Sequence, residues 1–482
     1  MTLGSCGKSK QNKMAKVVSQ ETFDNVVLEN VVEFDMEIEE AIKDAEMEFQ
    51  SQGVHLGTIV KNMHLSKDKK SIVHEILFAL DKIKCAADGS PNEHEIAEPL
   101  ATFTTECKVS VAHRVLANNN NAYEALIKLI KKVQGDSTLL APSLKAMAAL
   151  MEQNSDILTS EGSQLLLDLL KDWTNRTEES RVPEYLGRWS TECCLKHEQN
   201  RQNLVAAGAL GTLVAFLQAH KSNSKAIRTT SKAIRAFTLD DDMRQEYGKA
   251  HEHARLLVEE HGLIPICLDL IKNSLKESDT ASELLSTVSK LCVRAEYCQE
   301  AVDHSALIVI NDILVSFPDH AALNKQAMTF LKTLVGNDKV KAEAMKTGSP
   351  QLIVAALAKH QAIPGVCEAA TGAISFLALR VPAHAKQLMQ LGAGQAIVQA
   401  MKVHPQQKQL QKLGCMAIRN LVARVPENQQ MFIEYNVEDV IHAALENHGE
   451  AVKDVAQAAL RDMDLKVNLV EQWRGTGHEI CR

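Results

Sequence analysis

The chain contains 482 residues, of which 45% are hydrophobic and 4% aromatic, and its formal net charge is −8 at pH 7. This composition excludes a general positive field that would attract nucleic acid or an anionic membrane, and no stretch has the roughly 18 uninterrupted apolar residues that span a bilayer. The eleven cysteines are scattered, without a C-x-x-C pair, which favours a reduced intracellular location in the cytoplasm, the nucleus or both.

The chain begins with a polar, aperiodic segment, residues 1–17, which we predict to be disordered. Residues 18–66 form an acidic arm, because positions 21–50 carry eleven Asp or Glu and a single lysine. Apolar residues recur at helical spacing in two runs of this arm, the first of them following Ser19, a good N-cap residue. The arm is therefore predicted to contain two amphipathic helices.

The segment 67–468 is internally repetitive. Residues 373–398, AISFLALRVPAHAKQLMQLGAGQAIV, nearly match the stretch 44 residues later, so that the Arg-Val-Pro at 380–382 falls on the Arg-Val-Pro at 424–426. Similarity at this period is typical of a helical solenoid, and we predict about nine repeats with an irregular first one. The register is anchored on the residue that opens each long second helix: Ala122, Gly162, Gly208, Gly262, Ser305, Gly348, Gly392 and Asn436.

Each repeat is interpreted as a short helix, a longer second helix and a third helix, with Gly or Asn suited to the tight bend between the first two. A helical run of apolar residues is expected to begin at Ile72 and to continue through Ile83. A charged stretch, LDDDMRQEYGKAHEHAR at 239–255, interrupts the period as an insertion, and residues 469–482 are left as a C-terminal tail.

The stretch NRQNLVAAGALGTLVAFL at 200–217 resembles armadillo repeats. HEAT repeats, which share the period but use two helices, are the second choice. Three stretches that general armadillo repeats lack, at 18–56, 239–255 and 291–303, are similar to the armadillo repeat-containing protein six family. This resemblance covers residues 18–468. It implies an all-α, right-handed superhelical solenoid with a role in protein interaction and no catalytic motif.

In armadillo solenoids the third helices line a concave groove, and members that bind extended peptides carry a ladder of asparagines there with a Trp one turn earlier. In this chain the Trp positions contain no Trp, and only the last ladder position is Asn. This pattern argues against recognition of a nuclear localisation signal. The projected ladder positions are Ala149, Glu192, Ala236, Lys290, Thr333, Phe376 and Asn420.

One turn beyond the ladder, four of six projected positions are cationic, which suggests a basic strip that pairs with carboxylates. The alternative, which we favour, is that these cations complement the dipoles of the helix ends. The candidate residues for partner binding in the groove are Lys196, Arg235, Lys290, Arg294, Thr333, Phe376, Arg380, Asn420 and Arg424.

The acidic arm has two interpretations. It folds onto the basic groove as an intramolecular contact, or it caps the first repeat through Phe23, Val27 and Ile42, and we favour the cap because terminal repeats need one.

The insertion at 239–255 carries three consecutive aspartates and a His-x-His pair. A metal site is disfavoured because alternate residues of a helix point in different directions. A solvated loop or helix that docks across the groove, or that displays a partner epitope, fits better.

The sequence contains no P-loop, no dinucleotide-binding fingerprint and no nucleophile elbow. We therefore expect no catalytic, cofactor-binding or metal-binding residues and no cofactor. The predicted function is that of a monomeric, non-enzymatic scaffold that binds a helical or acidic segment of a protein partner in the groove, without nucleic acid or membrane. The alternatives are a nuclear-transport adaptor for basic peptides and, less favoured, a cryptic enzyme or metal-binding protein.

Overall fold

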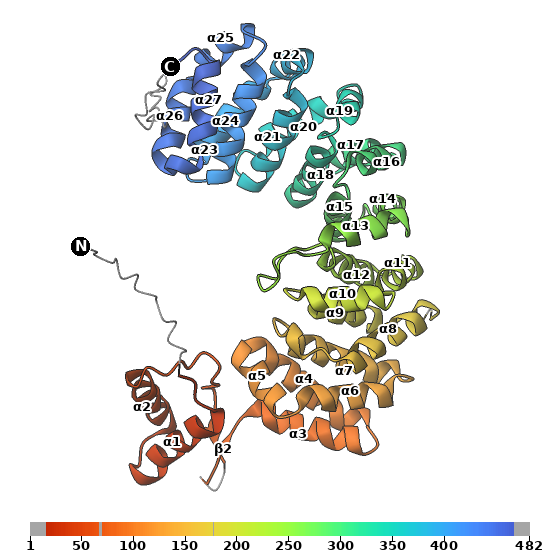
Figure 1. The fold of residues 1–482 in the computed structure, drawn as a ribbon, viewed down its shortest axis with the longest axis vertical. Helices are drawn as coiled ribbons and strands as arrows, with labels where there is room; N and C mark the ends of the chain where they lie inside the picture. The colour runs from red at the N-terminus through yellow and green to blue at the C-terminus, as the bar shows by residue number, and fades with distance from the viewer. Residues whose placement is uncertain (1–15, 67–69, 177, 467–482) are drawn as a thin grey trace, which may run out of the picture. The chain divides into compact units, whose positions relative to one another are not determined.

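The computed structural model describes residues 16–66, 70–176 and 178–466. The predicted tail and all but the last two residues of the predicted disordered N-terminus lie outside these described residues. Within them almost all regular structure is α-helical, which confirms the predicted all-α fold class (Figure 1). No single helix in the described ranges is long and apolar enough to cross a membrane, although the bent pair Glu198–Ala206 and Ala209–Ala219 meets those two criteria when taken together.

Contacts within the chain divide it into two compact units. Unit 1 contains Met1–His220 and Leu239–Lys249, and unit 2 contains Lys221–Thr238 and Ala250–Arg482. Part of the predicted insertion therefore belongs to unit 1, although the segment that precedes it in the chain belongs to unit 2.

The acidic arm is a small module at the start of unit 1, and Ser19 caps its first helix by accepting a hydrogen bond from the Thr22 N–H. Phe23, Val27 and Ile42, the residues expected to cap the first repeat, belong to a core that the arm builds from its own segments. The Phe23 and Phe49 rings pack 5.8 Å apart at its centre. The elements of the arm and of the hairpin that follows are α1 (Gln20–Glu33), α2 (Ile38–Ser51), β1 (His64–Leu65) and β2 (Ile72–Val73).

The hairpin corrects the prediction that Ile72 begins a helix. Ile72 pairs with Leu65 in a two-stranded antiparallel sheet, because two adjacent β-branched residues favour extended backbone. The helix starts only after His74, whose Nε2 lies 2.7 Å from Asp24 Oδ2 in the arm. The buried His74 thus ties the arm to the first helix of the repeats.

In the remainder of unit 1 short helices of 9 residues alternate with longer ones of up to 17 residues. They are α3 (Glu75–Asp88), α4 (Glu93–Val109), α5 (Val111–Asn119), α6 (Ala122–Val133), α7 (Ser137–Met151), the 3-10 turn η1 (Ser155–Ile157), α8 (Ser160–Thr174), α9 (Val182–Cys194), α10 (Glu198–Ala206) and α11 (Ala209–Ala219).

Unit 2 continues the same alternation of short and long helices. They are α12 (Ser224–Ala236), α13 (Ala250–Glu259), α14 (Leu263–Asn273), α15 (Ser278–Leu291), α16 (Ala295–Asp303), α17 (Ala306–Ser316), α18 (Ala321–Leu334), α19 (Asp338–Ala344), α20 (Ser349–Lys359), α21 (Pro364–Ala378), α22 (Pro382–Gln390), α23 (Ala393–Val403), α24 (Lys408–Val422), α25 (Glu427–Glu434), α26 (Val437–His448), η2 (Gly449–Ala451) and α27 (Lys453–Asp462).

The residues that open the second helices adopt the left-handed backbone conformation. Glycine reaches this region without steric cost and asparagine with little, which explains their use at the bend. Six of the eight anchored positions are such N-caps, with φ between 57° and 87°: Gly208, Gly262, Ser305, Gly348, Gly392 and Asn436.

The other two anchors differ. Asn121, one residue before the predicted Ala122, takes the left-handed conformation. Gly162 lies inside α8, whose cap is Thr159. A side chain at Gly162 would collide with the Tyr123 hydroxyl, which accepts a hydrogen bond from the Thr159 N–H. Gly162 is therefore required by close packing and not by a bend.

The third helices of the repeats pack in sequence against one another within each unit. In unit 1 these are α7 and α9, and in unit 2 they are α12, α15, α18, α21, α24 and α27. Leu377 in α21 and Leu421 in α24 are fully buried, as expected for helices that neighbours cover on more than one side. Each third helix therefore depends on the next for its burial.

A proline at Leu377 should unfold more than one repeat. It removes a hydrogen bond of α21 and clashes with the preceding turn, at a cost of roughly 3 kcal/mol or more, and the neighbours α18 and α24 lose their packing surface. Hydrogen exchange followed by mass spectrometry should show faster exchange in α18, α21 and α24 together. Faster exchange confined to α21 would contradict this coupling, and Leu377→Met serves as the control because it keeps an apolar, helix-compatible side chain.

Candidate functional site

The repeated Arg-Val-Pro motif builds a pocket in unit 2. A cavity of about 340 Å³ lies between the C-terminal ends of α21 and α24 and the start of α22, and both copies of the motif contribute to it. It brings together three of the nine predicted groove residues, and Arg419 joins them as a third arginine. The three predicted residues are Arg380, Asn420 and Arg424.

The local backbone places Arg380 at the edge of this cavity. After α21 ends, Arg380 adopts a left-handed conformation with φ 63°, which is uncommon for a residue with a long side chain. Pro382 then occupies the first turn of α22, where its fixed φ suits a helix start and its missing N–H costs nothing. The sharp turn between the two helices leaves the Arg380 side chain exposed.

The charges of the pocket are only partly balanced. Arg419 Nε donates to Asp462 Oδ2 at 3.1 Å. Arg424 Nη1 donates to the Arg380 carbonyl at 3.4 Å. No carboxylate of the described residues lies within ion-pair distance of Arg380 or Arg424, although Asp338, whose pKa is lowered mainly by Lys341, is close enough for Arg380 to contribute to that shift. Two guanidinium groups with free donors thus border the same cavity, a suitable arrangement for a bidentate acceptor such as a carboxylate.

Asn420, the single asparagine of the projected ladder, is engaged inside the protein. Its Nδ2 donates to the Ser375 carbonyl and hydroxyl oxygens, both at 3.0 Å. These bonds join α24 to α21, so the Asn420 amide group contributes to the packing of the third helices.

The remaining predicted residues of unit 2 do not line this pocket. Arg235 is half-buried and forms a 2.5 Å ion pair with Glu283 Oε2, which links α12 to α15. Arg294 lies 3.7 Å from Glu259 and over the Tyr297 ring. The Thr333 hydroxyl donates to the Thr329 carbonyl within its own helix. Phe376 is half-buried and Lys290 is exposed.

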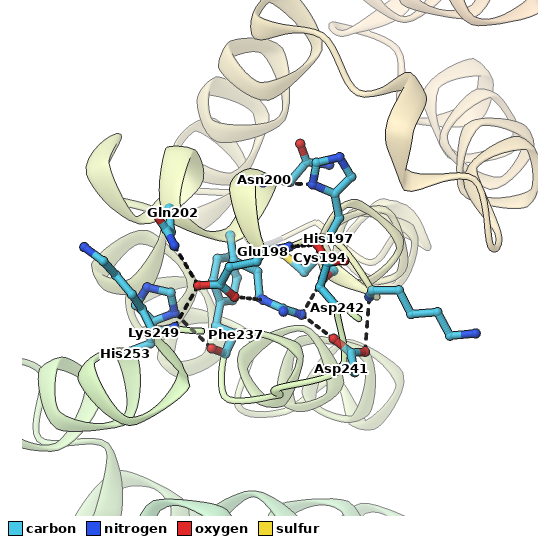
Figure 2. Close-up of polar contacts among 12 residues, drawn as sticks. Cys194, His197, Glu198, Asn200, Gln202, Phe237, Asp241, Asp242, Lys249 and His253 are labelled. Carbon is cyan, nitrogen blue, oxygen red and sulfur yellow. Dashed lines mark hydrogen bonds and ion pairs between the residues drawn. The ribbon is translucent and has the colours of Figure 1, made fainter. Parts of the chain in front are cut away.

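Lys196 is the one predicted groove residue in unit 1, and its backbone anchors the insertion. Its N–H donates to Asp241 Oδ2 at 3.1 Å, and its carbonyl accepts from Arg244 Nη2 at 2.7 Å. Figure 2 shows Asp241 and Asp242 directed toward the start of α10, where His197 and Glu198 lie. The stretch 239–249 is therefore bound to unit 1, whereas 250–255 forms the beginning of helix α13.

The centre of this anchor is the fully buried Arg201. Its guanidinium donates to Glu198 Oε2 at 2.8 Å, to Asp241 Oδ1 at 2.6 Å and to the Cys194 carbonyl at 2.9 Å. Such a buried charge is tolerated because its partners are charged and close. The insertion thus supplies the second counter-charge that Arg201 needs.

Asp242 completes the anchor. Its carboxylate accepts from the Glu198 N–H at 2.9 Å and from Arg244 Nε at 2.8 Å. The hydrogen bonds from Arg244 hold the pKa of Asp242 well below its usual range. A carboxyl with a lowered pKa adds stability above its unfolded pKa and loses it as the pH falls through the folded value, so this anchor persists well into the acidic range.

The metal interpretation of the insertion finds no support in these contacts. In the described residues no group of three or more His, Cys, Asp or Glu is arranged to hold a metal ion. His253 instead contacts the Phe237 carbonyl through Nδ1 at 3.0 Å.

Glu192, one of the projected ladder positions, has a raised pKa that the projection did not indicate. Burial, and then the negative charge of Glu152, raise the pKa of Glu192 to about 7. The carboxyl group lies in α9 within unit 1, and a sequence offers no signal for this shift because Glu152 is distant in the chain.

Two family models match the chain, and they meet between the arm with its hairpin and the first helix of the repeats. A family model described as ARMC6 matches residues 76–481, and one described as the armadillo repeat-containing protein 6 N-terminal domain matches residues 15–74. The chain is 37% identical to human armadillo repeat-containing protein 6 over 397 residues, covering 80% of this chain and 78% of the human protein. It is 34% identical to the Drosophila melanogaster homolog over 385 residues, covering 79% and 81% respectively.

Among solved structures, an engineered protein matches with a TM-score of 0.56 at 14% identity. The match covers 81% of this chain and 99% of the engineered protein. At this identity the likeness concerns the fold alone.

Removing the Asp242 carboxylate should release the insertion. Asp242→Ala leaves the Glu198 N–H without its acceptor and removes the carboxylate that Arg244 Nε contacts, while Arg244 Nη1 keeps its 2.6 Å ion pair with Asp156, so the local loss is about 1–3 kcal/mol. Trypsin should then cleave after Arg244 faster in the variant than in the unmodified chain, with the exposed Asp240→Ala as a matched control. Equal cleavage in all three proteins would show that the insertion is not anchored by these bonds.

Glu192 should make stability depend on pH. The unfolded chain releases this proton near the ordinary value of 4.5, whereas the folded chain keeps it until about pH 7, so folding is progressively penalised between these values and remains so above them. Glu192→Gln should therefore raise the free energy of unfolding by about 1–3 kcal/mol more at pH 8 than at pH 5. Urea unfolding at both pH values measures this difference, and an equal effect at each pH would refute the assignment.

Proposed function

This chain belongs to the armadillo repeat-containing protein 6 family, and we propose that it is a non-enzymatic scaffold that binds an acidic segment of a protein partner at the pocket between α21, α22 and α24. The observation that carries this proposal is the pair of arginines, Arg380 and Arg424, that border one cavity without a carboxylate partner among the described residues. A repeat family and an all-α fold fit a role in binding.

The chemistry of the pocket favours an acidic segment over a general apolar one. A guanidinium presents several N–H donors in a planar fork that matches two carboxylate oxygens. The neighbouring Arg419 adds positive charge even though Asp462 partly neutralises it. Small and apolar residues of the helix ends, among them Ala378 and Ala385, leave room for the stem of an Asp or Glu side chain.

The alternative function, an adaptor for basic peptides, is disfavoured for two reasons. The ladder of asparagines is missing, and the single one present, Asn420, donates to Ser375. A peptide rich in Lys and Arg would also meet like charge at Arg380 and Arg424, which opposes binding.

Reversing the pocket charges should abolish partner binding. The double variant Arg380→Glu/Arg424→Glu places two carboxylates where an acidic segment binds, and loss of a hydrogen-bonded charge pair typically costs about 2–5 kcal/mol. The measurement is a pull-down from native cells with quantitative mass spectrometry, with helicity checked by circular dichroism. The partners lost should be enriched in acidic segments.

Two controls separate the pocket from the overall charge. Lys272→Glu/Lys359→Glu makes the same change in net charge at two exposed lysines of the second helices α14 and α20; it removes their ion pairs with Asp269 and Asp319 and should keep the partners. Arg294→Glu tests another residue of the predicted basic strip and should also keep them. Retention of every partner by the Arg380/Arg424 variant would refute the proposed function.

A further inference from the structure

A second cavity lies in unit 1, away from all nine predicted groove residues. It has a volume of about 440 Å³ and is formed by the N-terminal halves of α7 and α9 together with the loop that leads into α9. Its polar lining comes mainly from hydroxyl and cationic side chains, and Glu179 is the one carboxylate that borders it. The hydroxyl-bearing and cationic residues of the lining are Ser137, Thr138, Lys145, Ser180, Arg181 and Tyr185.

The nearest buried acid has no capacity left for the cavity. Glu184 is almost completely buried, with its side chain 4% exposed. Arg181 Nη2 donates to Glu184 Oε2 at 3.0 Å, and Arg188 Nη2 donates to Glu184 Oε1 at 2.7 Å. Both carboxylate oxygens are thus engaged by two different arginines.

The same two arginines are oriented by an aromatic ring. The guanidinium carbon of Arg181 lies 4.9 Å from the centroid of Tyr185, and that of Arg188 lies 5.6 Å from it. Cation–π attraction and the shared Glu184 together restrict these long side chains. Arg181, the one of the two arginines that lines the cavity, is therefore held in place before a ligand binds, which reduces the entropy that binding would cost.

Lys145 supplies an unbalanced charge. It is half-buried, and no carboxylate of the described residues pairs with its ammonium group. Burial lowers the pKa of Lys145, and so do the positive charges of Lys108, Arg181 and Arg188, with only Glu184 acting in the opposite direction. The ammonium thus lies in a positive field that a bound anion would relieve.

We propose that this cavity binds a phosphate monoester carried by a phosphorylated residue of a partner protein. Lys145 and Arg181 line the cavity, and Arg188 and Lys108 add to the positive field at Lys145; these four cations exceed Glu184, the exposed Glu179 and Asp136 by one, so the site stays positive after its own acids are counted. A phosphate monoester carries close to two negative charges and three acceptor oxygens. The hydroxyls of Ser137 and Ser180 add donors at the wall, whereas the Thr138 hydroxyl already donates to Asp136 Oδ1 at 2.7 Å.

The reactivity of the Lys145 amine provides a direct test on the full chain. Acetylation with a limiting amount of an N-hydroxysuccinimide ester at pH 8, followed by peptide mass spectrometry, reports the accessibility of each lysine. N-acetyl-O-phosphoserine, which has no amine to consume the ester, should protect Lys145 several-fold, whereas N-acetylserine and N-acetylglutamate should protect it little, and the exposed Lys171 on α8 should be unaffected by all of them. Equal protection by N-acetylglutamate, protection by inorganic phosphate without protection by N-acetyl-O-phosphoserine, or no protection would each overturn the proposal.

A binding measurement tests the link to a protein partner. A degenerate phosphoserine peptide library on beads should retain the chain more strongly than the same library without phosphate, and Lys145→Met should abolish this difference. Lys171→Met is the matched control and should keep it. Retention that is independent of phosphate, or unchanged in Lys145→Met, would refute the site. Lys145→Met should leave the interactions that need Arg380 and Arg424 intact, so failure here is distinguishable from failure of the pocket in unit 2.

Discussion

The structure depends on one constraint, the burial of the third helices by neighbouring third helices within each unit. A helix such as α21 is apolar on more than one side, with Ile374, Leu377 and Ala378 all inaccessible to water, and it would not be stable alone. This requirement fixes where the ends of the third helices lie. The buried core therefore fixes the positions of the residues just beyond those ends, including Arg380 and Arg424.

Much of the fold was predictable because the backbone imposes it locally. The bend into each second helix needs a left-handed residue, so Gly or Asn recurs there with the period of the repeat, and Gly392 and Asn436 could be read directly. The failures have equally specific causes. Gly162 follows the same spacing, yet it is a glycine because a side chain there would collide with the hydroxyl of Tyr123, which lies 39 positions earlier in the chain. Ile72 has the right apolar character for a helix, but its β-branched neighbour favours the strand that pairs with Leu65.

The candidate sites were less predictable, since the sequence shows charges but not their partners. Arg235, Arg380 and Arg424 look alike in a projected register. In the structure Arg235 is paired with Glu283, 48 residues away, whereas the other two have no carboxylate partner among the described residues. The aspartates of the insertion appeared free and instead hold Arg201 and Arg244. The sequence gives no signal at Lys145, because its ammonium group lacks a carboxylate partner only since Glu184 is engaged by Arg181 and Arg188.

These pairings also restrict how the proposed acidic partner would be recognised. The chain has a net charge of −8, so its average electrostatic field does not attract anions from a distance. Its acidic arm is a folded module with a core of its own. Exposed charges farther apart than roughly 8 Å are largely screened at physiological ionic strength. Attraction must therefore come from short-range contacts inside cavities, where several guanidinium or ammonium groups converge and screening is weaker. A local excess of positive charge within an acidic protein favours selectivity. A partner gains favourable electrostatic binding energy only when its anionic group enters the cavity and reaches those donors.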